Sequence, residues 1–186
     1  MNRSTSGPLS PIFGNEPRTL SVVLVLAGAP FTALVADYVV VTLLQFGMTL
    51  VQRIVMAVMF FEAAGGAIAF STESTRAWWR ARPISCWGLL VANVVQPFVL
   101  WQVFRDDPSI NLGWFTVAWA VPVGTAALVL FWPRRSRAAF AMFATVVVTL
   151  AYLYVLPRGN IALVWFTYVF TYKLVLGFAS GTAPAR

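Results

Sequence analysis

Two opposite charges stand inside apolar stretches of this sequence. Glu62 lies within residues 58–70, and Lys173, the only lysine, lies in an apolar segment nearer the C-terminal end. An ionisable group at membrane depth is costly, so it usually faces the protein interior or a partner and marks a functional site by default. Each charge lies 13 residues from the outer end of its predicted helix, about 20 Å along the axis. The shared depth predicts that they interact, as a structural ion pair or within a functional site, unless Lys173 reaches the cytoplasmic interface instead.

Asp37 is the second acid within apolar sequence. It is about 10 Å along the axis from the outer end of the first predicted helix, and Arg53 is about 6 Å into the second, within reach of its long side chain. A structural pair between Asp37 and Arg53 is therefore expected. If Arg53 instead points to lipid headgroups, Asp37 becomes an unpaired acid and a candidate catalytic group beside Glu62.

Small and polar side chains could complete a site around Glu62. Gly65 and Gly66 follow it closely and leave the helix face nearly bare, which lets a second helix approach or leaves room for a ligand. Asn93 and Gln96 are three residues apart and share one face of another predicted helix. They either hold neighbouring helices together or line a substrate site.

Aromatic residues recur at helical spacing near the C-terminal end. Trp165, Tyr168 and Tyr172 repeat along one predicted helix, and Trp119 on another lies at a similar depth to Trp165. Packing between helices explains this pattern most simply. The alternative is an aromatic-lined pocket whose ring faces stabilise a cation, with Lys173 among its walls.

The composition excludes several kinds of chemistry. Histidine is absent and Cys86 is the only cysteine, which removes histidine-ligated haem, Cys-His catalysis and dithiol exchange. Asp106 and Asp107 stand alone before Pro108, so paired aspartate-rich motifs for magnesium diphosphate are missing as well. We therefore predict no metal site and no cofactor.

Hydrophobic residues make up 60% of the 186 residues and charged residues only 10%. Because the apolar residues fall in long runs, they predict an all-α, polytopic membrane bundle. Residues 1–19 are expected to be a disordered cytoplasmic tail, residues 20–178 a single membrane domain and residues 179–186 a short cytoplasmic tail. Six transmembrane helices are predicted, at residues 20–44, 49–71, 85–104, 112–132, 137–156 and 160–178, with the first turn at residues 45–47.

The loops differ in arginine content. Three arginines lie between the second and third helices and three around the loop between the fourth and fifth, whereas the alternate loops hold one each. This asymmetry predicts that the arginine-rich loops and both termini are cytoplasmic, in a bacterial-type inner membrane. The net charge of +7 is thus a topology signal and not a nucleic-acid surface.

Phe60 and Phe61 directly before Glu62, within aromatic apolar sequence, resemble the aromatic-Glu pair of small integral-membrane terpene cyclases from meroterpenoid and indole-sesquiterpene pathways. The resemblance covers about a fifth of the chain. It implies that Glu62 protonates an isoprenoid-type substrate. That family commonly has seven helices and a second acid near its C-terminus, whereas six helices are predicted here and no acid follows Asp107.

Residues 172–177, in which Lys173 precedes an apolar stretch ending in glycine, are similar to the retinal-bearing last helix of microbial rhodopsins. A seventh helix and the arginine-aromatic-acid run of a third helix are lacking.

These observations together predict a membrane enzyme, a terpene cyclase by resemblance, with Glu62 and Asp37 as candidate acids. Its expected partners are the lipid bilayer and an apolar small molecule, not nucleic acid. Two alternatives stand beside it: a transporter or ion-coupled carrier that uses the Glu62 and Lys173 pair, and a non-catalytic subunit of a membrane complex. The sequence does not predict the oligomeric state.

Overall fold

The computed structural model describes residues 8–14, 19–39, 47–155 and 161–182, and all regular structure within these ranges is helical. The elements are α1 (Ser10–Phe13), α2 (Thr19–Tyr38), α3 (Leu50–Ser71), α4 (Glu73–Arg80), α5 (Pro83–Ala92), α6 (Val95–Val103), α7 (Leu112–Phe131), α8 (Arg137–Val155), α9 (Ile161–Thr171), the π-helix η2 (Tyr172–Ala179) and α10 (Ser180–Thr182). The predicted all-α class is confirmed for the described residues.

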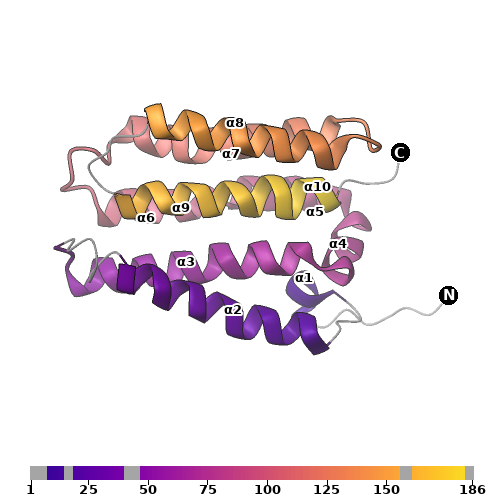
Figure 1. Ribbon diagram of the computed structural model, residues 1–186, viewed down its shortest axis with the longest axis horizontal. Helices are drawn as coiled ribbons and strands as arrows, with labels where there is room; N and C mark the ends of the chain where they lie inside the picture. The colour runs from indigo at the N-terminus through magenta and orange to yellow at the C-terminus, as the bar shows by residue number, and fades with distance from the viewer. Residues whose placement is uncertain (1–7, 15–18, 40–46, 156–160, 183–186) are drawn as a thin grey trace.

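The long helices run back and forth between the two ends of the bundle (Figure 1). Four segments of the described chain are long and apolar enough to cross a membrane: Thr19–Tyr38, Leu50–Ser71, Cys86–Val103 and Leu112–Phe131. Two further apolar helices, Arg137–Tyr152 and Leu163–Ala179, are shorter. The protein is therefore a membrane-type helical bundle with four candidate spans, and six crossings remain a prediction.

The α9–η2 segment lies at the centre of the bundle, where η2 packs against α3, α7 and α8. Phe166, Phe170, Leu174 and Phe178 along it are fully buried. By contrast, α2 packs mainly on α3 and leaves Leu26 and Leu34 exposed. The buried face of the α9–η2 segment therefore belongs to the core, whereas the bare apolar face of α2 suits contact with lipid.

The third predicted helix is interrupted. Where the sequence predicted one helix over residues 85–104, α5 ends at Ala92 and α6 begins at Val95. Pro97 explains the break, because it has no N–H to donate to the carbonyl of Asn93, and its ring crowds that same carbonyl. The interruption therefore falls at Asn93, one of the predicted site residues.

The last predicted helix also differs from a regular α-helix. It starts as α9, widens into η2 at Tyr172 and continues past residue 178 into α10. Wide π-turns are rare and often occur at functional sites. Gly177 lies in this widened part, and a Cβ there would be 3.3 Å from Phe70 Cβ, so the glycine lets η2 approach α3 closely.

Part of the predicted disordered tail is folded. Leu9 ends a turn that leads into α1, which packs on α4, itself a helix where the sequence predicted a loop. Trp79 Nε1 donates to Pro11 O at 2.9 Å, and Thr75 Oγ1 donates to Ile12 O at 2.6 Å. The prediction was wrong for residues 8–14. Their backbone carbonyls accept hydrogen bonds from side chains of α4, and the apolar pattern of the sequence does not indicate these bonds.

The boundary between the first two long helices falls partly outside the described residues. The described part of α2 ends at Tyr38, and α3 begins at Leu50 behind a Thr49 cap that exchanges two hydrogen bonds with Gln52. The predicted end of the first helix at residue 44 and most of the predicted turn at residues 45–47 lie in the part that the structure does not describe.

Candidate functional site

The two charges at shared depth form an ion pair. Lys173 Nζ on η2 donates to Glu62 Oε1 on α3 at 2.6 Å. Charge-assisted hydrogen bonds of this length are among the stronger ones in proteins. The predicted interaction between Glu62 and Lys173 is confirmed, and it joins segments 111 residues apart in the sequence.

Two amides from the α5–α6 break complete the polar cluster. Lys173 Nζ also donates to Asn93 Oδ1 at 2.9 Å, while Gln96 Nε2 donates to Glu62 Oε2. Asn93 Nδ2 in turn donates to Leu89 O at 2.7 Å, which fixes the orientation of its amide. Both amides therefore contact the ion pair, Asn93 through Lys173 and Gln96 through Glu62.

The stem of Lys173 runs across a bare patch of α3. A Cβ at Gly66 would lie 2.6 Å from Lys173 Cε and 3.1 Å from Cδ, so only glycine leaves space for the lysine in this position. Gly65 faces α2 instead, where a Cβ would lie 3.2 Å from Ala29 Cβ. The small residues after Glu62 thus admit neighbouring protein, and the described site leaves no room for a ligand at these two positions.

The two members of the pair differ in exposure. The side chain of Lys173 is 2% exposed, whereas that of Glu62 is 45% exposed. Val58 and Phe61, close to Glu62 on α3, are 52% and 46% exposed. The carboxylate therefore lies at an open side of the bundle, with its cation buried behind it.

The cluster is suited to holding and moving a proton. Two of the three ammonium N–H groups have oxygen acceptors, and the ring of Phe170 lies 5.9 Å from Nζ. A proton can pass between Lys173 and Glu62 along their direct hydrogen bond, and a molecule at the open side of Glu62 would meet the carboxyl group. Removing Glu62 alone would leave the buried ammonium of Lys173 without a counter-charge, which is strongly destabilising.

Asp37 belongs to a different pair. Arg53 Nη2 donates to Asp37 Oδ2 at 2.7 Å and Arg53 Nε donates to Oδ1 at 3.1 Å. Arg53 precedes Glu62 by nine residues on α3, which is about 14 Å of helix axis. The expected Asp37–Arg53 pair is confirmed, and the structure does not bring Asp37 to Glu62.

The contacts given by the described structure for the aromatic candidates are with residues other than Glu62. Trp165 lines an apolar hollow of about 120 Å³ together with Phe60 and Val169, and Tyr172 lines a separate hollow that we describe below; Glu62 lines neither. Tyr168 stacks obliquely on Tyr152 with ring centroids 6.1 Å apart. Trp119 is half-buried in α7. None of these contacts joins an aromatic candidate to Glu62, and the aromatic wall around the acid stays a prediction.

Three features of the site escaped the sequence interpretation. Gly66 was noted as small, but its fit to Lys173 depends on the distance between two helices. Pro97 does carry a sequence signal for a helix break. Phe170 precedes Lys173 by three residues, a spacing that places both on one side of a helix. Within the described residues, no group of three or more His, Cys, Asp or Glu side chains is placed to hold a metal ion.

No family model matches the chain, and neither the curated proteins nor the solved structures gave a match.

Proposed function

We propose that this protein is a multi-pass membrane enzyme that acts on an apolar, isoprenoid-type molecule, with Glu62 and Lys173 as a proton-transfer pair. The observation that carries the proposal is the exposure of the pair: a carboxyl group at the depth of a membrane-crossing helix is 45% exposed, and its lysine partner is 2% exposed. A molecule dissolved in the bilayer can approach such a carboxyl group from the side. The carboxyl group of Glu62 thus lies on the side of the bundle that faces the bilayer.

In the proposed cycle the proton starts on Lys173, whose Nζ donates to Glu62 Oε1 at 2.6 Å. When an apolar substrate covers the open side, water leaves and two separate charges become more costly than a neutral acid and amine. Transfer along the hydrogen bond then gives a Glu62 acid that can protonate an alkene or epoxide. Loss of a proton from the resulting cation to Glu62 closes the cycle, so no cofactor is required.

The resemblance of Phe60, Phe61 and Glu62 to the aromatic-Glu pair of membrane terpene cyclases agrees with this chemistry. It is a resemblance of a short motif, so the proposal depends mainly on Glu62, Lys173 and the two amides that hold them. Asn93 and Gln96 are assigned a positioning role, since each bonds one member of the pair.

We further propose that the chain crosses a bacterial-type inner membrane six times with both termini in the cytoplasm. The arginine-rich loops support this orientation. The alternation of helix directions and the position of α1 and α10 at the same end of the bundle support an even number of crossings (Figure 1).

The test compares membranes from hosts that express the wild type, Glu62→Gln or Asp37→Asn. Prenylated substrates and their epoxides are supplied, and products are separated by chromatography before mass spectrometry, because cyclisation can leave the mass unchanged. We expect Glu62→Gln to abolish turnover even in protein that elutes as a folded species in size-exclusion chromatography, since the amide has no acidic proton. Asp37→Asn should retain turnover, because Asp37 is engaged by Arg53 away from Glu62. Full turnover by a well-folded Glu62→Gln protein would exclude the proton-donor role.

A proton-coupled carrier is the second candidate, and the direct ion pair between α3 and the wide helix η2 favours it. A carrier would break and remake this pair as it exposes the site to each side. Purified protein in liposomes with a pH-sensitive dye distinguishes the two. Proton flux that is absent in Glu62→Gln, without conversion of any prenylated substrate, would favour the carrier.

A further inference from the structure

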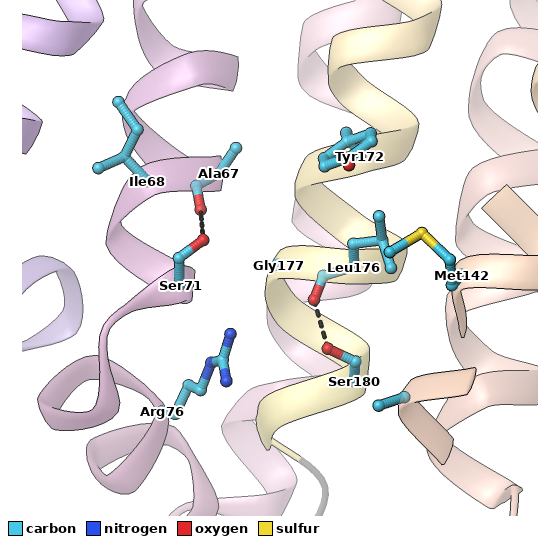
Figure 2. A pocket seen from close by; sticks show the side chains of 10 residues that line it. Ala67, Ile68, Ser71, Arg76, Met142, Tyr172, Leu176, Gly177 and Ser180 are labelled. Carbon is cyan, nitrogen blue, oxygen red and sulfur yellow. Dashed lines mark hydrogen bonds between the residues drawn. The ribbon is translucent and has the colours of Figure 1, made fainter. Parts of the chain in front are cut away.

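A second hollow, of about 480 Å³, lies between α3, η2 and α8, at the end of the bundle where α4 is placed (Figure 2). Its walls are apolar and include Ala67 and Ile68 of α3, Leu176 of η2 and Met142 of α8. The volume is in the range of small-molecule sites, roughly 300–1,000 Å³. None of the four residues of the Glu62 cluster lines it, so the inference is independent of the role of Glu62.

Arg76 supplies the charge at one end of this hollow. Its Nε donates to Phe70 O at 2.6 Å, and its stem lies against Gly181, where a Cβ would collide with it. Figure 2 shows the guanidinium turned toward the space between α3 and η2. The arginine is thus held by one nitrogen and presents the rest of its planar group to the hollow.

The other polar groups near Arg76 are already engaged. Ser71 Oγ donates to Ala67 O at 2.8 Å, and Ser180 Oγ donates to Leu176 O. Glu73, the acid closest in sequence, forms its ion pair with Arg80. Among the ion pairs of the described residues none involves Arg76, so within this part of the chain the guanidinium has no carboxylate partner.

We propose that this hollow binds a membrane lipid with an anionic phosphate headgroup. The phosphate would bond to Arg76, since a guanidinium matches phosphate geometry well, and one acyl chain would lie along Ala67, Leu176 and Met142. The location fits this ligand, because α3 ends at Ser71 and the half-buried Trp78 of α4 is of a residue type that favours the membrane interface.

Charge complementarity favours a lipid over a second copy of the chain. The sequence holds only six acids against 13 Lys and Arg, so another copy offers few anionic groups to Arg76. A free anion in water would use the arginine but not the apolar walls. An anionic lipid uses both.

The experiment uses the full chain in neutral detergent, with mixed micelles of phosphatidylglycerol and phosphatidylcholine, and counts bound lipid by native mass spectrometry. Wild type should retain phosphatidylglycerol in preference to phosphatidylcholine. In Arg76→Gln the ratio of bound phosphatidylglycerol to bound phosphatidylcholine should fall roughly fivefold, which is the contribution of one arginine near an anionic surface. Arg134→Gln removes the same charge from an exposed residue outside the hollow and should leave the preference unchanged.

A second pair of variants tests the walls without removing charge. Ala138 and Ala139 are both exposed on α8, and only Ala138 lines the hollow. Ala138→Phe should fill the hollow and reduce binding of either lipid at this site, whereas Ala139→Phe should not. Because both alanines are exposed, neither variant disturbs the core, and size-exclusion chromatography checks that both remain folded.

Three results would overturn the proposal. Equal loss in Arg76→Gln and Arg134→Gln would show general attraction to anionic micelles. Displacement of the lipid by millimolar inorganic phosphate would identify a site for a free anion. A change from dimer to monomer in Ala138→Phe, with lipid binding unaltered, would show that a second copy covers the hollow.

Discussion

The side chain of Lys173 crosses α3 at Gly66, so closely that a Cβ at position 66 would lie 2.6 Å from Lys173 Cε. Gly66→Ala should therefore displace the lysine from Glu62. Overpacking of this kind typically costs about 1–3 kcal/mol. We expect a lower midpoint of thermal unfolding in detergent, measured by circular dichroism, and weaker coupling between Glu62 and Lys173 in the same background.

Gly124→Ala is the matched control for this change. Gly124 also lies within a long apolar helix, and a Cβ there meets no atom within 4 Å. Since alanine is favoured over glycine in helices by up to about 1 kcal/mol, this variant should be as stable as wild type or more so. Equal behaviour of the two alanine variants would show that Lys173 does not need the space at Gly66.

The ion pair itself should behave asymmetrically. Glu62→Gln leaves an ammonium that is 2% exposed without its counter-charge, whereas Lys173→Met leaves a carboxyl group that is 45% exposed and still bonded by Gln96. Removing one partner of a buried pair costs about 3–5 kcal/mol, so Glu62→Gln should approach this range and Lys173→Met should cost less. The double variant should be less destabilised than the sum of the two.

The same cycle with Asp37→Asn and Arg53→Met provides a comparison. Arg53 is 40% exposed and Asp37 27%, near the ends of their helices, and exposed pairs are usually worth at most about 1 kcal/mol. Thermal unfolding of the wild type, the four single variants and the two double variants measures both couplings. If the coupling of Glu62 and Lys173 were no larger than that of Asp37 and Arg53, the buried lysine would not be held by its acid.

Both ion pairs could be predicted from the sequence, because charged residues are scarce within the apolar segments and their depth can be counted along a helix. That count favours the pairing of Glu62 with Lys173 and of Asp37 with Arg53, and the structure decides between these pairings and the alternatives. The all-helical class follows from the apolar runs in the same way. These are properties of single segments, which a sequence displays directly.

The remaining features depend on how segments meet. The widening of the last helix at Tyr172 has no signal in the residues that form it. Nor does the docking of α1, since Trp79 and Thr75 bond backbone carbonyls of residues whose own sequence shows no helical pattern. The helix break at Asn93 could be predicted, because a proline four residues later, Pro97, interrupts a helix. The aromatic wall stays a prediction, because spacing along one helix does not show which neighbour a ring faces.

The proposed crossings predict the location of each loop. Reporter domains fused after residue 108, between α6 and α7, should be active outside the cytoplasm, and those fused after residue 135, between α7 and α8, should be active inside. A fusion at the C-terminal end should also be active inside. An external C-terminal reporter would mean that one of the two shorter apolar helices does not cross.

The last prediction concerns the docking of α1 on α4. Gly14 ends α1 with φ of +76°, a conformation that other residues rarely adopt, and a Cβ there would collide with the backbone carbonyl of Ser74. Gly14→Ala should therefore undock α1, with a local cost of about 1–3 kcal/mol from the strained backbone conformation. Amide hydrogen exchange followed by mass spectrometry should show faster exchange in residues 8–14 and around Thr75, whose hydroxyl loses its acceptor.

Gly47→Ala serves as the control, because a Cβ at Gly47 meets nothing within 4 Å. It should leave exchange in residues 8–14 unchanged. Neither variant should affect the ion pair of Glu62 and Lys173. These two residues bond each other, whereas the hydrogen bonds of α1 are with α4. Slow exchange of residues 8–14 in Gly14→Ala would show that the turn tolerates a side chain at position 14. The docking of α1 would then depend on its hydrogen bonds with Trp79 and Thr75 and not on the close approach of Gly14 to Ser74.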